Sequence, residues 1–383
     1  MRERGDASAA DIASGTALAR STISVGLAEL RRAGIVVEIE QPTETLRRVG
    51  RPASTFALNP RTGTCVGLHL GLNGIRVLVT DVAHTILHKA DIAIGLDYLP
   101  QRAVDVARKL VRDAYSELGL SARTILGVGV SVAGPVAPDG RVQKASIVPM
   151  WLGIHICDLF EPAFGKPVYA DNESNCTALA ELLWGAAANH DDFVYFKIDI
   201  GLGGAIVVKR QVLRGIAGRA GEFGHISVDA NGTKCRCGNR GCLELTASFR
   251  TVVDRLSRRR RRPITIEDIV TMANEGETES IKAIVAIADA VGHGLGILGS
   301  ILNPGLVVVV VGGRSVVAGP LLFDRLRQSY ERHTLLKTTS LKEEHRICIR
   351  PAQFPVDGPL MGAVALVLHG ESQTLHPAHS ITM

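Results

Sequence analysis

The chain has 383 residues, of which 46% are hydrophobic and 21% are charged, so it is long and apolar enough for more than one packed domain and wholesale disorder is excluded. Its formal net charge of +5 is compatible with an anionic partner without requiring one. The first residues are polar and lack the apolar core of a signal peptide, and apolar runs such as 306–311 are far shorter than the roughly 20 residues that span a bilayer. We therefore expect a cytoplasmic protein.

The first 60 residues predict short helices followed by a turn rich in Gly and Pro. One helix is expected over 9–14, ended by Gly15 and Thr16, and a second is expected over 20–33. Ile23, Leu27 and Leu30 are spaced four and three apart in this second helix, which predicts one buried face. Spacing alone leaves two interpretations open: a plain helical hairpin and a helix-turn-helix.

The start of the second helix carries small polar side chains and an arginine, which suit a DNA-recognition helix. These residues lie largely off the apolar face: Arg20, Ser21, Thr22 and Ser24. A wing strand is expected over 35–39, and Arg51 of a Gly-Arg-Pro turn would lie at the wing tip, where arginine can enter a minor groove. We interpret residues 1–60 as a winged helix-turn-helix domain with these five residues at the DNA. A winged helix-turn-helix normally has a further helix upstream, but only about eight residues precede the first predicted helix here. We therefore expect either that this upstream helix is absent or that the natural chain starts earlier.

Residues 61–368 alternate between strand and helix patterns, which is typical of an α/β domain. Strands are expected over 65–80 as a hairpin, and over 125–132, 168–170, 193–200, 205–208 and 306–311. Helices are expected over 174–185 and over 281–302, where nearly every residue is apolar. Residues 369–383 are polar and are expected to form a frayed tail.

Three of the seven cysteines are clustered downstream of a histidine. His225 is followed by Cys235, Cys237 and Cys242, with two glycines that allow tight turns between the sulfurs. One imidazole and three thiolates form a complete tetrahedral ligand set for Zn²⁺ and leave no open position, so we expect a structural zinc site over 225–242. The alternative is three unrelated thiols and a surface histidine, but clustered cysteines in a cytosolic protein more often bind metal.

These segments together resemble the ROK (repressor, open reading frame, kinase) family, and specifically its transcriptional regulators of the xylose-repressor and N-acetylglucosamine-repressor type. Residues 220–225 (AGEFGH) and 235–244 (CRCGNRGCLE) are similar to its two most specific signatures. Residues 172–181 resemble its sugar-site motif, 311–313 its late glycine motif, and 20–38 with the Gly-Arg-Pro turn its DNA-binding extension. The resemblance implies an α/β, actin-like sugar-kinase (ribonuclease H-like) domain of two lobes after an α+β winged helix-turn-helix domain. It also implies a homodimer or homotetramer that binds a double-stranded DNA operator.

Carried over onto this chain, the resemblance implies sugar contacts from Asn172, Glu173, Glu222, His225 and Glu244. Such a set is chemically reasonable because a sugar ring needs convergent donors and acceptors, and one carboxylate can accept from two adjacent hydroxyls. His225 could bind zinc through one ring nitrogen and a sugar hydroxyl through the other. Each of these residues alone is more simply a surface carboxylate or an amide cap.

The chain departs from the kinases of the family on the side where ATP would bind. Glu173 stands where a kinase has the aspartate that takes the proton from the attacking hydroxyl, and the extra methylene displaces the carboxylate. His69 replaces the aspartate of the first phosphate loop, and Ile200 after Asp199 removes a hydroxyl from the second. We therefore expect a sugar sensor with no catalytic residue. The alternatives are a sugar kinase for ATP-dependent hexose phosphorylation and a DNA-binding protein without a ligand.

A run of five arginines, Arg258–Arg262, precedes Pro263 and could contact DNA. Charge runs are usually solvated, and we interpret this one as a solvated loop.

Overall fold

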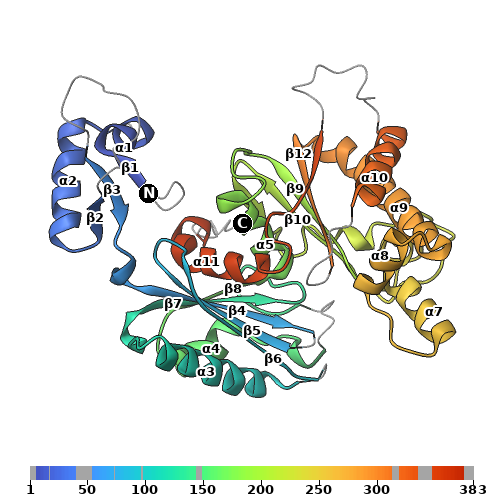
Figure 1. Ribbon diagram of the computed structural model, residues 1–383, viewed down its shortest axis with the longest axis horizontal. Coiled ribbons are helices and arrows are strands. Elements are labelled where there is room, and N and C mark those ends of the chain that lie inside the picture. The colour runs from blue at the N-terminus through green and yellow to red at the C-terminus, as the bar shows by residue number, and fades with distance from the viewer. Residues whose placement is uncertain are drawn as a thin grey trace, which may run out of the picture.

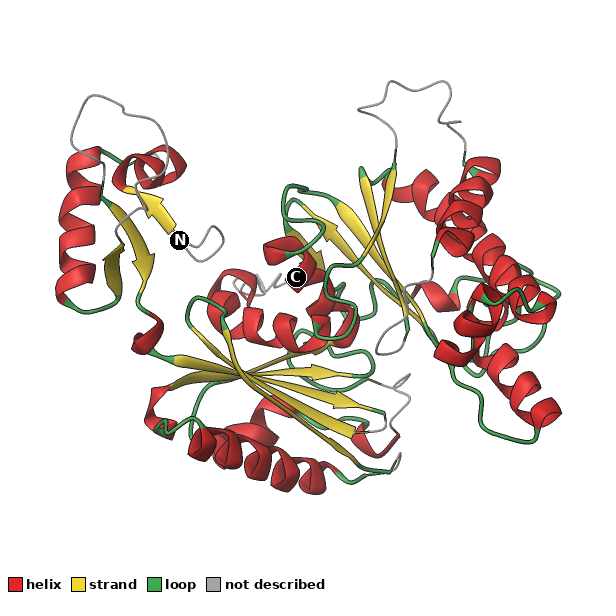
Figure 2. Ribbon diagram, viewed as in Figure 1, coloured by secondary structure: helices red, strands yellow, loops and turns green. Residues whose placement is uncertain are grey.

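The computed structural model describes residues 6–16, 18–39, 54–72, 74–95, 98–143, 149–312, 319–334 and 347–374. Within these ranges a small N-terminal module is followed by two α/β lobes, each built on a five-stranded mixed sheet (Figures 1 and 2). The α/β architecture predicted from alternating strand and helix patterns is confirmed.

The N-terminal module packs two helices on a three-stranded antiparallel sheet of order β1-β3-β2. Its elements are β1 (Asp6–Ser8), α1 (Ala9–Thr16), α2 (Arg20–Arg32), β2 (Val36–Ile39) and β3 (Thr55–Leu58). Residues 40–53 between β2 and β3, with Arg51 and its neighbours Gly50 and Pro52, lie outside the described residues.

Two details of this module differ from the prediction. The first helix continues through Gly15 and Thr16, and the Thr16 hydroxyl donates to the carbonyl of Ile12 in the last turn. Leu30 is 38% exposed, although the spacing predicted it to be buried. Among the residues that the structure describes, the buried hydrophobic cluster of the module is formed by Ile23, Leu27 and Val36, so it ends before the last turn of α2.

The first lobe has a sheet of order β6-β5-β4-β7-β8, in which β4 pairs antiparallel with β5 and parallel with β7. Its strands are β4 (Thr64–Gly71), β5 (Gly74–Asp81), β6 (Ile86–Ala93), β7 (Ile125–Val132) and β8 (Val168–Asn172). One face is covered by α3 (Pro100–Glu117) and α4 (Ile156–Phe164), and the other by α11 (Gly358–Thr374), which extends past the predicted domain end at residue 368 (Figure 1). The hairpin over 65–80 and the strand over 125–132 are confirmed.

Glycines in the centre of this sheet let α11 approach the strands closely. A Cβ on Gly129 would lie 1.8 Å from the carbonyl oxygen of Ala363, and one on Gly67 would lie 2.6 Å from that of Leu360. A side chain at either position would force the helix away from the sheet.

The second lobe has a sheet of order β11-β10-β9-β12-β13. Its strands are β9 (Phe193–Ile198), β10 (Leu202–Val208), β11 (Gln211–Leu213), β12 (Leu306–Val311) and β13 (Cys348–Pro351). Every residue of β12 is buried: Val307, Val309 and Val311 pack on the face with α8 (Ile266–Asn274) and α9 (Thr278–Leu302), and the alternate residues pack toward α5 (Glu173–Trp184). Burial on both faces explains why this strand is continuously apolar instead of alternating.

Helix α9 is the one helix of the described part of the chain that is long and apolar enough to cross a bilayer, and half of its apolar stretch is buried in the protein. It packs closely on α10 (Pro320–His333) through glycines. A Cβ on Gly292 would lie 2.4 Å from that of Ser329, and one on Gly296 would lie 2.7 Å from that of His333. Its composition is therefore that of a core helix.

The arginine run is not a loop, as the sequence suggested, but the end of α7 (Arg250–Arg260) and the residues that follow it. Its side chains are exposed. Three of them form ion pairs with acidic side chains of α8 and the start of α9: Arg259 with Glu279, Arg260 with Glu277 and Arg262 with Asp268. These pairs hold like charges together at the end of a helix, where the helix dipole also favours cations.

Candidate functional site

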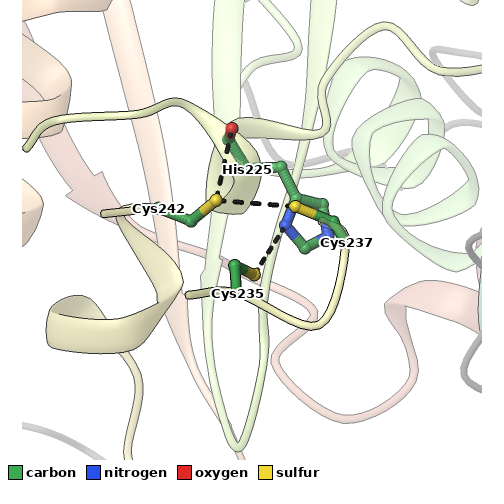
Figure 3. Close-up of side chains that lie close together, drawn as sticks. All are labelled: His225, Cys235, Cys237 and Cys242. Carbon is green, nitrogen blue, oxygen red and sulfur yellow. Dashed lines mark hydrogen bonds between the residues drawn. The ribbon is translucent and has the colours of Figure 1, made fainter. Parts of the chain in front are cut away.

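The predicted metal ligands come together in the second lobe. The ligand atoms of His225, Cys235, Cys237 and Cys242 all lie within 4.8 Å of one another (Figure 3). The Sγ of Cys235 is 3.7 Å from the Nδ1 of His225, and the sulfurs of Cys237 and Cys242 are 3.6 Å apart. Ligands at tetrahedral corners around Zn²⁺ are about 3.8 Å apart if the Zn–S bond is about 2.3 Å. The cluster therefore fits a tetrahedral metal ion.

The backbone of this loop is shaped by its own hydrogen bonds. Cys235 donates its N–H to the carbonyl of Asn239 at 2.7 Å, which closes the turn between the first two thiols. Gly241 has φ +60°, and a Cβ there would lie 1.8 Å from the carbonyl oxygen of Asp229. The turn thus requires glycine beside Cys242, and it directs three sulfurs inward without help from distant elements.

Asn172 and Glu173 lie where β8 meets α5. Asn172 is the N-cap of α5: its Oδ1 accepts the N–H of Ser174 at 2.8 Å and of Asn175 at 3.4 Å. Its Nδ2 donates to the carbonyl of Gly134 at 2.7 Å. Both lone pairs of the amide oxygen are in use, so Asn172 retains one N–H for a ligand and acts mainly by positioning Glu173.

Glu173 has charged and polar partners from both lobes. Its Oε1 accepts from the Nζ of Lys197 on β9 at 2.9 Å, and its Oε2 is 3.7 Å from the Nε2 of His69 on β4. Burial raises the pKa of Glu173, but Lys197, together with His69 in its protonated form, outweighs burial and leaves the pKa below its ordinary value. Burial lowers the pKa of His69 to about 4, so this imidazole is neutral at neutral pH.

Glu222 and Glu244 lie near each other and near Glu173. Burial raises the pKa of Glu222, the negative charge of Glu244 adds to the increase, and Arg219 and Arg236 oppose it. The charge of Glu173 also acts on Glu222. Glu173 and Glu244 therefore both lie within electrostatic range of Glu222, the third carboxylate predicted to bind sugar hydroxyls.

Glu244 connects the carboxylate group to the metal cluster. It is 7% exposed, accepts the N–H of Leu202 at 3.1 Å and pairs with Arg236 at 3.0 Å. Burial lowers the pKa of His225, and the neighbouring Glu244 partly offsets that effect. His225 is thus a predicted metal ligand that also borders the carboxylates.

Sequence reasoning missed Lys197 and Arg236, which neutralise the predicted sugar-binding carboxylates. Lys197 could have been noticed as the single charged residue in the otherwise apolar strand FVYFKI. Arg236 lies between two predicted metal ligands, but nothing local indicates that its partner is Glu244.

The glycine-rich turn between β9 and β10 is bonded within the protein. Asp199 donates its N–H to the carbonyl of Gly201 at 2.9 Å, and Ile200 donates to the Oδ1 of Asp199 at 2.7 Å. Leu202 donates to Glu244. A phosphate cradle needs backbone N–H groups that point at the ligand, and three in this turn already have partners.

Four of the predicted DNA-binding residues lie together at the start of α2. Arg20, Ser21, Thr22 and Ser24 are all exposed, whereas Ile23 between them is buried. The Ser24 hydroxyl donates to the carbonyl of Arg20 at 2.9 Å, within the helix.

The chain is similar to proteins of one family over most of its length. Residues 65–369 match the sequence profile of the ROK family. The xylose repressor of Bacillus subtilis strain 168 is 26% identical over 355 residues, a match that covers 92% of this chain and 88% of that repressor. The solved structure of a ROK family transcriptional regulator, a homolog of the E. coli MLC protein, has a TM-score of 0.77 at 24% identity. The match covers 96% of this chain and 93% of the regulator's chain.

A kinase of known structure shares the two-lobed part. The ROK family glucokinase from Streptomyces griseus, solved with glucose and AMPPNP, has a TM-score of 0.67 at 28% identity. The match covers 79% of this chain and 99% of that one. Regulators and sugar kinases thus share this fold, and the kinase-like α/β architecture expected from the sequence is confirmed.

Proposed function

The chain belongs to the ROK family, and from that premise we propose that it is a cytoplasmic, sugar-responsive transcriptional repressor whose kinase-like domain binds sugar without phosphorylating it. The similarity to the xylose repressor supports this proposal because it extends over 92% of the chain and so includes at least part of the N-terminal module. The partners are an operator in double-stranded DNA, a monosaccharide effector and other copies of the chain in a homodimer or homotetramer.

The observation that carries the proposal is the turn at Asp199–Leu202. The N–H groups of Asp199, Ile200 and Leu202 are bonded to Gly201, to the Asp199 side chain and to Glu244, so these three offer nothing to a nucleotide phosphate. Phosphoryl transfer depends on positioned charges around the phosphates, and at the two phosphate loops this chain has His69 and Ile200. The residues that the resemblance assigns to sugar binding, by contrast, are present: Asn172 and the carboxylates of Glu173, Glu222 and Glu244.

The N-terminal module would be the DNA reader, as a winged helix-turn-helix. Its α2 would lie in the major groove with Arg20, Ser21, Thr22 and Ser24 at the base edges and phosphates, and Arg51 would contact the minor groove. The exposure of the first turn of α2 and the antiparallel pairing of β2 with β3 support this arrangement.

Zinc would be bound by His225, Cys235, Cys237 and Cys242. With four protein ligands the ion would be structural, and it would hold His225 and the start of α6 (Glu244–Ala247), which carries Glu244, against the sugar site. Sugar contacts would come from Asn172, Glu173, Glu222, His225 and Glu244.

Sugar binding would change DNA affinity by favouring one arrangement of the two lobes. In a dimer, that arrangement sets the distance between two readers, which must match the helical repeat of the operator. We expect a coupling free energy of about 1–3 kcal/mol, equal in both directions, so DNA also changes the affinity for sugar.

The test begins with an operator selected by the chain from a random duplex library. Operator affinity is then measured by fluorescence anisotropy at fixed salt, with and without D-xylose, D-glucose or N-acetyl-D-glucosamine. We expect one of these sugars to change the affinity, Glu222→Ala to abolish the change without weakening DNA binding, and Arg20→Ala to weaken DNA binding without affecting the sugar. Unchanged affinity at saturating sugar refutes the proposal.

The alternative of a sugar kinase is favoured by the similarity to the glucokinase from Streptomyces griseus. It is tested by incubating the protein with ATP, Mg²⁺ and the same sugars, with Glu173→Ala as the control. A sugar phosphate formed above the control level would establish the kinase instead.

A further inference from the structure

A half-buried lysine, Lys197, lies in a group of charged side chains with Glu173 and Asp199. Lys197 points from β9 with its side chain 24% exposed, and its Nζ lies 2.9 Å from the Oε1 of Glu173 and 3.4 Å from the Oδ2 of Asp199. Both carboxylates hold the pKa of Lys197 above its ordinary value, although burial alone would lower it. Lys197 is therefore a permanent cation at this position.

Glu173 depends on Lys197 for its charge. Its side chain is 18% exposed, and the other basic side chain within 4.0 Å of its carboxylate in the described part of the chain, His69, is neutral at neutral pH because burial lowers the pKa of that imidazole to about 4. The Nδ1 of His69 is 3.2 Å from the hydroxyl of Ser131. Other titratable or charged groups act on this cluster from neighbouring elements: Arg76 on β5, Cys176 on α5, Tyr195 on β9, Asp199 directly after β9, and Glu222 before His225.

We infer that Lys197 is a positioning residue of the sugar site, which holds Glu173 ionised and fixes its carboxylate so that a sugar hydroxyl meets a charged acceptor. The inference rests on the proposed sugar-binding function and assigns a role to a residue that the sugar motif does not contain. Its physical basis is that an isolated buried carboxylate takes up a proton, whereas a carboxylate paired with an ammonium at hydrogen-bond distance keeps its charge.

The same pair makes Glu173 unsuitable as a general base. A base must accept a proton at the working pH, and its pKa is best close to that pH. Lys197 lowers the pKa of Glu173 and uses one of its oxygens. The ion pair between Lys197 and Glu173 would therefore both favour hydrogen bonding to a sugar hydroxyl and prevent Glu173 from acting as a catalytic base.

Isothermal titration of D-xylose, D-glucose and N-acetyl-D-glucosamine, from about pH 5.5 to pH 8.5, tests the inference with four proteins. They are the wild type, Lys197→Met, Lys197→Arg and Lys109→Met, which breaks the exposed pair with Asp113 as a matched control. Wild type, Lys197→Arg and Lys109→Met should bind the preferred sugar with little pH dependence. Lys197→Met should bind it about tenfold or more weakly near neutral pH, because a charged hydrogen-bond acceptor is lost, and its affinity should recover as the pH rises and Glu173 ionises.

Either of two results overturns this role. The first is that Lys197→Met binds sugar as tightly as the wild type does, and the second is that its affinity is reduced equally at every pH, which shows a purely structural contribution. Lys197→Arg separates charge from shape because it retains the cation on a side chain of different geometry.

A measurement without sugar distinguishes failure of this inference from failure of the proposed function. In Lys197→Met, burial should raise the pKa of Glu173 above its value in the unfolded chain, so stability is lost as the pH rises through the raised pKa. The melting temperature of Lys197→Met should therefore fall relative to wild type with rising pH, and adding Glu173→Gln should remove that fall. If no sugar binds to the wild type but this pattern is seen, the proposed function fails alone; if sugar binds and the pattern is missing, the inference fails alone.

Discussion

Removal of one metal ligand is the sharpest test of the clustered thiols. In Cys237→Ser the hydroxyl replaces a thiolate at the exposed corner of the cluster, while His225, Cys235 and Cys242 remain in place. We expect wild-type protein to carry one zinc ion per chain and the variant to lose it during dialysis against a mild chelator.

The magnitude follows from the number of ligands. Structural zinc sites bind with an apparent free energy of about 10–16 kcal/mol, so one of four ligands accounts for about 3–4 kcal/mol, or roughly a 10²–10³-fold loss of zinc affinity. The hydrophobic core beside this loop, with Phe196, Leu256 and Ile287, does not include the cluster's exposed Cys237. The lobe should therefore stay folded, with a lower melting temperature and a disordered zinc loop.

The assay is elemental analysis of zinc per chain, followed by competition with a chromophoric chelator. Cys157→Ser is the control, since this half-buried cysteine on α4 lies outside the cluster. Because Glu244 follows Cys242 closely, the variant should also bind sugar more weakly, whereas the control should not.

Full retention of zinc by Cys237→Ser would refute the four-ligand site. Absence of zinc from protein purified without chelators would do the same. Equal losses in Cys157→Ser and Cys237→Ser would show that the effect comes from general destabilisation and not from coordination.

Three further outcomes are expected. Burial lowers the pKa of His69 in the folded protein to about 4, below the ordinary 6.5, so its contribution to stability is present above pH 6.5 and is lost as the pH falls toward 4. In urea unfolding, the free energy of unfolding of the wild type should therefore fall by about 3 kcal/mol more than that of His69→Gln between pH 6.5 and pH 4. Equal losses in the two proteins would contradict this expectation. Arg214→Met leaves Asp171, 3% exposed, without its bonds from Arg214, and should lower the free energy of unfolding by about 3–5 kcal/mol, with partial recovery on adding Asp171→Asn. Arg20→Ala should reduce the slope of log affinity for operator against log salt by about 1; an unchanged slope would remove Arg20 from the phosphate contacts.

Local patterns were sufficient for many elements of the fold. The strand over 306–311 and the hairpin from Cys65 follow from β-branched runs and glycine positions, and both lie where they were predicted. The arginine run was misassigned because its acidic partners come from α8 and the start of α9, which the run itself does not reveal.

The sequence by itself determined the family, the α/β class and the metal cluster, because these depend on the types of residues at short, regular spacings. His225 and the three cysteines fall within 18 positions of one chain segment, and the turns between them are encoded by the glycines there. Only the tertiary structure decided the electrostatic state of the proposed sugar site. Lys197 on β9 meets Glu173 at the start of α5 across 24 residues, and His69 on β4 meets Ser131 on β7 across 62, because the fold brings these elements of the two lobes together. Whether a buried carboxylate is charged depends on which cation the fold brings within hydrogen-bond distance, and that distance is set by packing, not by spacing along the chain.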